Sequence, residues 1–111
     1  MPIQAFRMTL YPGQMAEYRR RHDALWPELS AALQQAGIEE YRIFLDSETH
    51  QLFAVMVLRE DHQADRLPEL SVMRRWWAYM ADIMETHEDQ APVSVPLDEV
   101  FTFLPGATSC K

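Results

Sequence analysis

Cysteine and glycine are nearly absent from this sequence of 111 residues. Cys110 is the single cysteine, so no intrachain disulfide can form, and a cytoplasmic location is expected. There are 3 glycines and no low-complexity run, which argues against a disordered chain. The length suits one folded domain, which we predict to span residues 1–105, followed by a polar tail at 106–111 that carries no prediction.

Long apolar runs and an excess of basic residues are missing too. No stretch approaches the roughly 18 apolar residues of a transmembrane helix, and the N-terminus lacks the pattern of a secretory signal. Lys and Arg number 10 against 17 Asp and Glu, a formal net charge of −7 that would repel phosphate backbones. The run from Arg19 to Arg21 is interpreted as the solvent face of a helix. We therefore expect neither a membrane nor a nucleic acid partner.

Motifs for metals and cofactors are absent as well. No two histidines have the spacing of a helical zinc site, there is no CxxC pair, and no glycine-rich phosphate loop is present. We predict no metal and no organic cofactor.

Apolar side chains, by contrast, are plentiful and periodic. Alternation predicts four strands, at Ile3–Leu10, Glu39–Leu45, Gln51–Leu58 and Val100–Leu104. Apolar residues at steps of three and four predict a helix after the turn at residues 11–14, which ends at Gly37. Pro27 lies inside this helix and predicts a kink or a restart just after His22.

The second half of the chain predicts another helix, opened by Pro68 and running through Met84. A short helix within residues 60–66 is a further possibility, and residues 85–96 are expected to be irregular. The order β-α-β-β-α-β is typical of an α+β ferredoxin-like sandwich. Because the segment 52–58 is apolar on both faces and two helices cover only one, we expect a homodimer that stacks sheet on sheet, as in a dimeric α/β barrel.

Two groups of side chains suggest a chemical site. Tyr18 and His22 are four residues apart in a helical stretch, so they project from one helical face. Trp76 and Trp77 are adjacent on the second helix, about 100° apart around its axis, so both cannot point into the same core. A phenol, an imidazole and flat indole walls together suit a small polar ligand such as a sugar. Taken alone, a histidine on such a face is more often structural than catalytic.

The motifs in their order along the chain resemble the L-rhamnose mutarotase family. They are Tyr18-x-x-x-His22, Trp26-Pro27-Glu28-Leu29, Tyr41, Arg75-Trp76-Trp77-x-Tyr79-Met80-x-Asp82-Ile83-Met84 and Pro92-Val93-Ser94. The resemblance runs from about residue 3 to residue 105. It implies a cytoplasmic homodimer that interconverts the α and β anomers of L-rhamnose without a cofactor.

By position, the resemblance implies that His22 is the proton donor and that Tyr18, Tyr41, Trp76 and Trp77 bind the sugar. Ring opening moves a proton from the C1 hydroxyl and another onto the ring oxygen, and an imidazole with a pKa near 6.5 exchanges protons readily at neutral pH. The second proton carrier stays open between Glu28, Asp82, a tyrosine and water. The alternative function is a small haem-binding or ligand-binding module of the same fold without catalysis.

Overall fold

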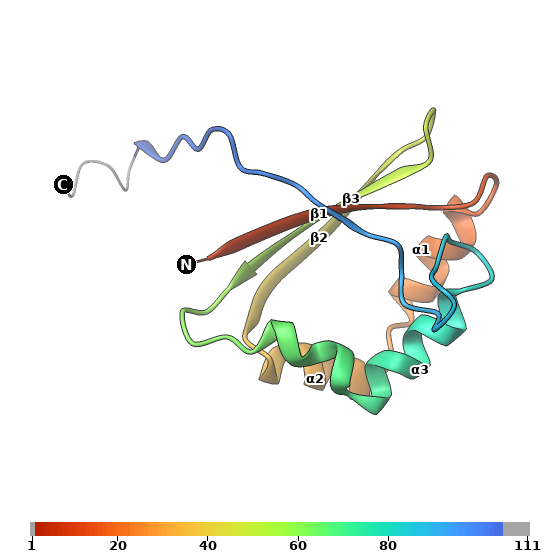
Figure 1. Cartoon of the computed structure of the whole chain (residues 1–111), viewed down its shortest axis with the longest axis horizontal. Helices are drawn as coiled ribbons and strands as arrows, with labels where there is room; N and C mark the ends of the chain where they lie inside the picture. The colour runs from red at the N-terminus through yellow and green to blue at the C-terminus, as the bar shows by residue number, and fades with distance from the viewer. Residues whose placement is uncertain (1, 106–111) are drawn as a thin grey trace.

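The computed structural model describes residues 2–105, so the predicted tail and Cys110 lie outside the described residues. Figure 1 shows a sheet with helices gathered on one of its faces. The elements in chain order are β1 (Ile3–Thr9), α1 (Met15–Asp23), α2 (Pro27–Gln35), β2 (Ile38–Asp46), β3 (Gln51–Leu58), the 3₁₀ helix η1 (Ala64–Glu69), α3 (Ser71–Met80) and β4 (Val95–Pro96).

The four strands form one antiparallel sheet in the order β2-β3-β1-β4. The expected mixture of helices with an antiparallel sheet is therefore confirmed, as is the hairpin of β2 and β3. In the register, Ala54 of the central strand β3 lies opposite Phe6 of β1 and Ile43 of β2. Because paired residues of antiparallel strands point to the same side, these side chains share one face.

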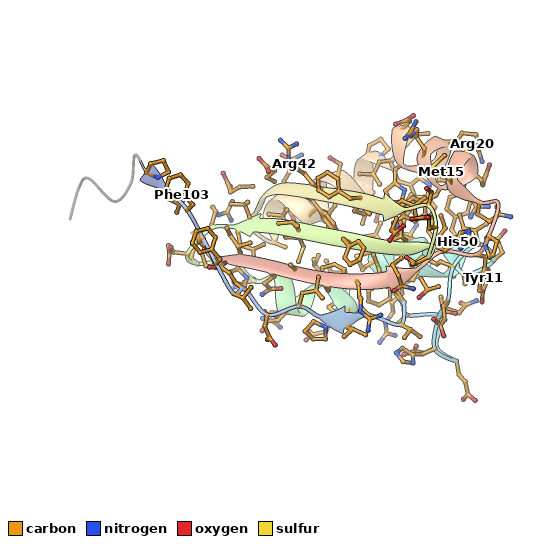
Figure 2. All side chains as sticks on the ribbon, turned by 90° about the horizontal axis from the view of Figure 1, so that it is seen from above. Tyr11, Met15, Arg20, Arg42, His50 and Phe103 are labelled. Carbon is orange, nitrogen blue, oxygen red and sulfur yellow. The ribbon has the colours of Figure 1, made fainter. Side chains whose placement is uncertain are left out.

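The sheet has one face covered by helices and one open face, and the alternating burial of β3 shows both. Leu52, Ala54, Met56 and Leu58 are buried and belong to the hydrophobic core. The residues between them point the other way and are half-buried, as the alternation of a strand requires. Figure 2 looks onto this open face, and no helix lies in front of it.

The break in the first helical region is a restart. Helix α1 ends at Asp23, and α2 begins with Pro27 in its first turn after Trp26 in an extended conformation. Proline suits this position because its missing N–H would have no helical partner there, and it disfavours helical geometry in the residue before it. Leu25 and Trp26, in the break, pack against the core.

The predicted final strand is wrong. Residues 100–104 form no strand, and the fourth strand is instead the short β4, where Pro96 pairs with Phe6 and Val95 with Arg7. After it, Leu97 still bonds to the sheet, from its N–H to the Ala5 carbonyl oxygen. The alternating pattern of 100–104 exists, but a strand needs a neighbouring strand to bond with, and Figure 1 shows this segment running off the sheet.

The predicted second long helix is divided and shorter than expected. Pro68 lies inside the 3₁₀ helix rather than at the start of α3, and Leu70 after it is extended. Helix α3 then ends at Met80, and Met84 forms an isolated bridge with Leu10 of the first strand region. The short helix expected within 60–66 is realised only from Ala64 onward. Of the segment 85–96 that was expected to be irregular, residues 85–94 lie in no helix or strand, but Val95–Pro96 form β4.

Gly37 allows the chain to turn from α2 into β2. Its φ is +97°, and an added Cβ would lie 2.8 Å from His62 Cβ. Gly13 has a similar φ of +81° but open space around its Cα. The two glycines therefore share the conformational requirement but differ in crowding.

Replacing each glycine by alanine separates these two effects. Gly13→Ala is expected to lower the free energy of unfolding by about 1 kcal/mol because of its positive φ. Gly37→Ala has the same conformational cost and a steric clash, so its total loss should be larger by about 1 to 3 kcal/mol. Urea denaturation followed by circular dichroism measures both. Equal losses for the two variants would show that His62 moves aside without strain.

Candidate active site

A cavity of about 1000 Å³ lies between the covered face of the sheet and the helices. This is at the upper end of the range for ligand pockets, about 300 to 1,000 Å³. The five residues predicted from the sequence as a site all line it: Tyr18, His22, Tyr41, Trp76 and Trp77. They come from α1, β2 and α3, so the fold brings together groups that are far apart in the chain.

His22 is held in one orientation by its own helix. Its Nδ1 lies 2.9 Å from the carbonyl oxygen of Tyr18, which can only accept a hydrogen bond. Nδ1 therefore carries the proton, and in the neutral ring Nε2 keeps its lone pair. The imidazole lies over the Tyr18 ring at 4.3 Å between centroids and meets Trp76 edge-on at 5.4 Å. Its tautomer and its tilt are both fixed.

Burial lowers the pKa of His22 below the usual 6.5, because the charged imidazolium loses hydration there. The bond to the Tyr18 carbonyl and the negative charge of Asp23 act in the opposite direction but are smaller effects. At neutral pH the ring is thus mainly neutral and able to accept a proton at Nε2. Its conjugate acid is a stronger acid than a free imidazolium and returns the proton easily.

Two phenols reach the cavity from opposite sides. Burial raises the pKa of Tyr41 to about 12, although 38% of the residue is exposed, which indicates that its hydroxyl end is the enclosed part. Burial also raises the pKa of Tyr18, and the nearby Tyr41 raises it further. The two hydroxyl groups therefore lie in the same region. At neutral pH both keep their protons and can donate hydrogen bonds.

The two adjacent tryptophans differ in their surroundings. Trp76 is 6% exposed and meets Trp26 edge-on at 5.1 Å, so it belongs to the core as well as to the cavity wall. Trp77 is half-buried and packs against the core from outside. Because neighbouring helical residues point in different directions, Trp77 offers the larger accessible indole surface. Nothing in the sequence indicated that Trp26 would pack against Trp76.

Two of the proposed second proton carriers lie in ion pairs instead. Glu28 binds Arg75 at 3.0 Å and Asp82 binds Arg21 at 2.9 Å. The hydrogen bond from Arg21 holds the pKa of Asp82 below its usual range. Neither Glu28 nor Asp82 lines the cavity, whereas Asp23 and Asp89 do.

Arg21 was interpreted from the sequence as part of a solvent-exposed run, and that interpretation is wrong for this residue. Arg21 is 8% exposed and bonds to groups at the end of α3, while Arg20 beside it is exposed. Glu17, four residues earlier, was the one local sign, since it pairs with Arg21 at 2.6 Å. The partner Asp82 is 61 residues away and has no such sign.

Two features are absent from the described part of the chain. Across residues 2–105, no three His, Cys, Asp or Glu side chains come together in a way that could hold a metal ion. None of the helices formed by these residues has the length and apolar character needed to cross a membrane.

Comparisons with known proteins identify the family of this chain. The family model described as L-rhamnose mutarotase matches residues 4–103. An L-rhamnose mutarotase of Burkholderia orbicola is 59% identical over 101 residues, which cover 91% of this chain and 97% of the relative. One from Jannaschia sp. is 58% identical over 101 residues, with the same coverage of 91% and 97%.

A solved structure agrees in fold. The crystal structure of an L-rhamnose mutarotase from Formosa agariphila matches with a TM-score of 0.86 at 43% identity, covering 94% of this chain and 100% of that one. The site and these matches define an anomer-interconverting carbohydrate isomerase. The chain belongs to the L-rhamnose mutarotase family. The haem-binding or non-catalytic alternative is not favoured.

The environment of His22 predicts its titration. The imidazole should titrate below pH 6.5, because burial disfavours its charged form more than Tyr18 and Asp23 favour it. Proton–carbon NMR of the histidine rings measures this, with the His22 signal identified by its loss in His22→Gln. A peptide of residues 18–26 gives the unburied reference. Titration of His22 at or above the value of the peptide would contradict the arrangement.

Proposed function

We propose that this protein interconverts the α and β anomers of L-rhamnose at C1, with His22 as the proton-exchanging residue. The observation that carries the proposal is the convergence of one oriented imidazole, two phenols and two indoles on a single cavity. The names of the relatives supply the sugar. Proton transfer is the only chemistry that the reaction needs, so the proposal includes no metal and no organic cofactor.

The protons balance with one histidine. Neutral His22 accepts the proton of the C1 hydroxyl at Nε2, the C1 oxygen becomes the aldehyde oxygen, and the bond from C1 to the ring oxygen breaks. The imidazolium then gives its proton to the ring oxygen. Both oxygens are bonded to C1, so one nitrogen can serve each in turn. Rotation about the C1–C2 bond and the reverse steps close the ring as the other anomer.

The other four residues bind and orient the sugar in this proposal. Tyr18 and Tyr41 keep their hydroxyl protons at neutral pH and can donate to sugar oxygens. Trp77 offers a flat apolar surface to a C–H face of the pyranose, and Trp76 holds the imidazole edge-on. Fixing the sugar against His22 is itself a large part of such catalysis, because it removes the entropy of bringing the groups together.

Proton NMR saturation transfer on equilibrated L-rhamnose tests the function. Irradiation of one anomeric proton should reduce the signal of the other in a protein-dependent way. His22→Ala should lower this exchange by about 10²- to 10⁴-fold, the usual contribution of general acid-base catalysis. Exchange should also decline as pH falls through the pKa of His22, because the protonated ring cannot accept the C1 proton.

His87→Ala is the control, since His87 is a histidine outside the cavity lining. It should exchange the anomers at the wild-type rate, and circular dichroism should show both variants folded. Wild-type protein without exchange above the uncatalysed rate would refute the function. Full exchange in folded His22→Ala would refute the role of His22 alone.

We also propose a single ferredoxin-like domain over residues 1–105 that forms a cytoplasmic homodimer through its open sheet face. The strand order β2-β3-β1-β4 with helices on one face supports this fold. On the open face, Ile3 and Phe44 are 50% and 57% exposed. The half-buried Phe53, Val55 and Val57 of β3 lie between them on the same face. An exposed apolar patch of this kind often marks an interface.

The segment after β4 adds further apolar surface. Val100, Phe101 and Phe103 are 93%, 80% and 72% exposed, and Figure 1 shows the segment extending beyond the sheet. Burying such residues against a second copy would stabilise the dimer by roughly 25 cal/mol for each Å² of apolar surface removed from water. A partner subunit would also give residues 100–104 the neighbour that a single chain does not provide.

Sedimentation velocity at micromolar concentration should show a dimer. Phe44→Arg, on the open face in the edge strand β2, should shift the protein to monomer because it buries an unpaired charge. Tyr11→Arg is the matched control, since Tyr11 is 43% exposed and lies in the turn after β1. Monomeric wild-type protein, or a dimer that survives Phe44→Arg, would reject this interface.

A further inference from the structure

The helix that carries His22 is held in place by an arginine. Arg21 is the buried residue of α1, and its other residues are half-buried or exposed. The backbone of α1 approaches the other elements only sparsely, whereas α2 and α3 pack against each other. A helix without a broad apolar face needs another means of attachment, since packing of such a face normally supplies most helical stability.

The guanidinium of Arg21 donates hydrogen bonds to oxygen atoms of three residues. Its Nη1 donates to the carbonyl oxygen of Tyr79 at 2.7 Å and to Asp82 Oδ1 at 2.9 Å, and Nη2 donates to Asp82 Oδ2 at 3.2 Å. Its Nε donates to Glu17 Oε2 at 2.6 Å. The guanidinium carbon also lies 4.4 Å from the centre of the Tyr79 ring. The planar guanidinium thus donates from Nε, Nη1 and Nη2 and also lies against an aromatic ring, a combination that the single ammonium of lysine cannot reproduce.

This attachment joins helix α1, which carries His22, to helix α3, which carries the two tryptophans. Arg21 lies on α1 between Tyr18 and His22, while Tyr79 is in the last turn of α3, close to Trp76 and Trp77. The Tyr79 carbonyl is among those that a helix leaves unpaired at its C-terminal end, where a cation is favourable. The length of this arginine therefore sets the spacing between the imidazole and the indole wall.

We propose that Arg21 is a positioning residue, which fixes α1 against the end of α3 so that His22 meets the sugar held by the tryptophans. The inference rests on the proposed function. Arg21 does not line the cavity, so it acts only through the placement of α1. A shift of the order of 1 Å in a reacting group can lower a rate by about 10²-fold.

The test compares Arg21→Gln and Arg21→Lys in the full chain. The exchange rate from saturation transfer is measured well below the unfolding midpoint and divided by the folded fraction. Arg21→Gln should lower this rate by about 10- to 100-fold, and Arg21→Lys should recover part of the loss because it keeps one donor to Asp82. A purely structural arginine would lower the unfolding midpoint and leave the rate of folded molecules unchanged.

The titration of His22 gives a second readout that does not depend on activity. If α1 is released, His22 becomes more hydrated, and its pKa should rise toward 6.5 in Arg21→Gln. Arg66→Gln is the control, because Arg66 is an exposed arginine outside the cavity lining and its side chain pairs with Glu69 of its own 3₁₀ helix. It should keep the wild-type rate and the wild-type titration.

Asp82→Asn keeps the test decisive if Arg21→Gln fails to fold. Asp82 has a side chain that is 67% exposed, so its loss of charge is tolerable for folding, yet it removes the ion pair. A several-fold loss of rate with a raised His22 pKa supports the proposal. Folded variants at positions 21 and 82 with wild-type rate and titration would overturn it. Absence of exchange in the wild-type protein would refute the proposed function. If the His22 pKa nevertheless rose in the Arg21→Gln or Asp82→Asn variant, the role of Arg21 in placing α1 would still be supported.

Discussion

The site depends on the ring contacts of Trp76. Its indole is buried and meets His22 edge-on at 5.4 Å, Trp26 edge-on at 5.1 Å and Tyr79 at 5.6 Å. These rings come from α1, from the break before α2 and from α3, so one side chain joins the three helical segments around the cavity. Edge-to-face geometry is the favourable one for aromatic pairs, because the positive edge of one ring meets the negative face of the other. Loss of this indole would therefore loosen the helices and the imidazole together.

The catalytic properties of His22 follow from the same arrangement. Burial among aromatic rings disfavours the imidazolium, while the bond from Nδ1 to the Tyr18 carbonyl decides which nitrogen is free. Because that bond lies within one helical turn, the tautomer needs no partner from elsewhere in the chain. A neutral ring with a fixed lone pair suits a reaction that begins with removal of a hydroxyl proton, and the weakened basicity of the ring favours return of that proton to the ring oxygen.

The sequence allowed the prediction of those features that depend on local pattern. The strands up to Leu58, the restart at Pro27 and the pairing of Tyr18 with His22 each reflect periodicity or a proline, so neighbouring residues are sufficient to define them. The misplaced strand at 100–104 shows the limit, since alternation indicates a two-faced segment but not a bonding partner. Arg21 shows it again, because its burial is decided by Asp82 and by the Tyr79 carbonyl, which only the folded chain brings near. The cavity lining as a set was reached through the family resemblance, not through spacing.

Polar attachment of α1 also explains how a cavity survives beside it. A helix with a broad apolar face would be drawn toward the sheet, since each buried CH₂ favours collapse by about 0.8 kcal/mol. Helix α1 instead keeps one buried side chain, and that side chain bonds to the end of α3 rather than to the sheet. Tyr18 and His22 on its inner side thus face a space of about 1000 Å³ that they line but do not fill. The composition of α1, unfavourable for packing, is what leaves room for a ligand next to the imidazole.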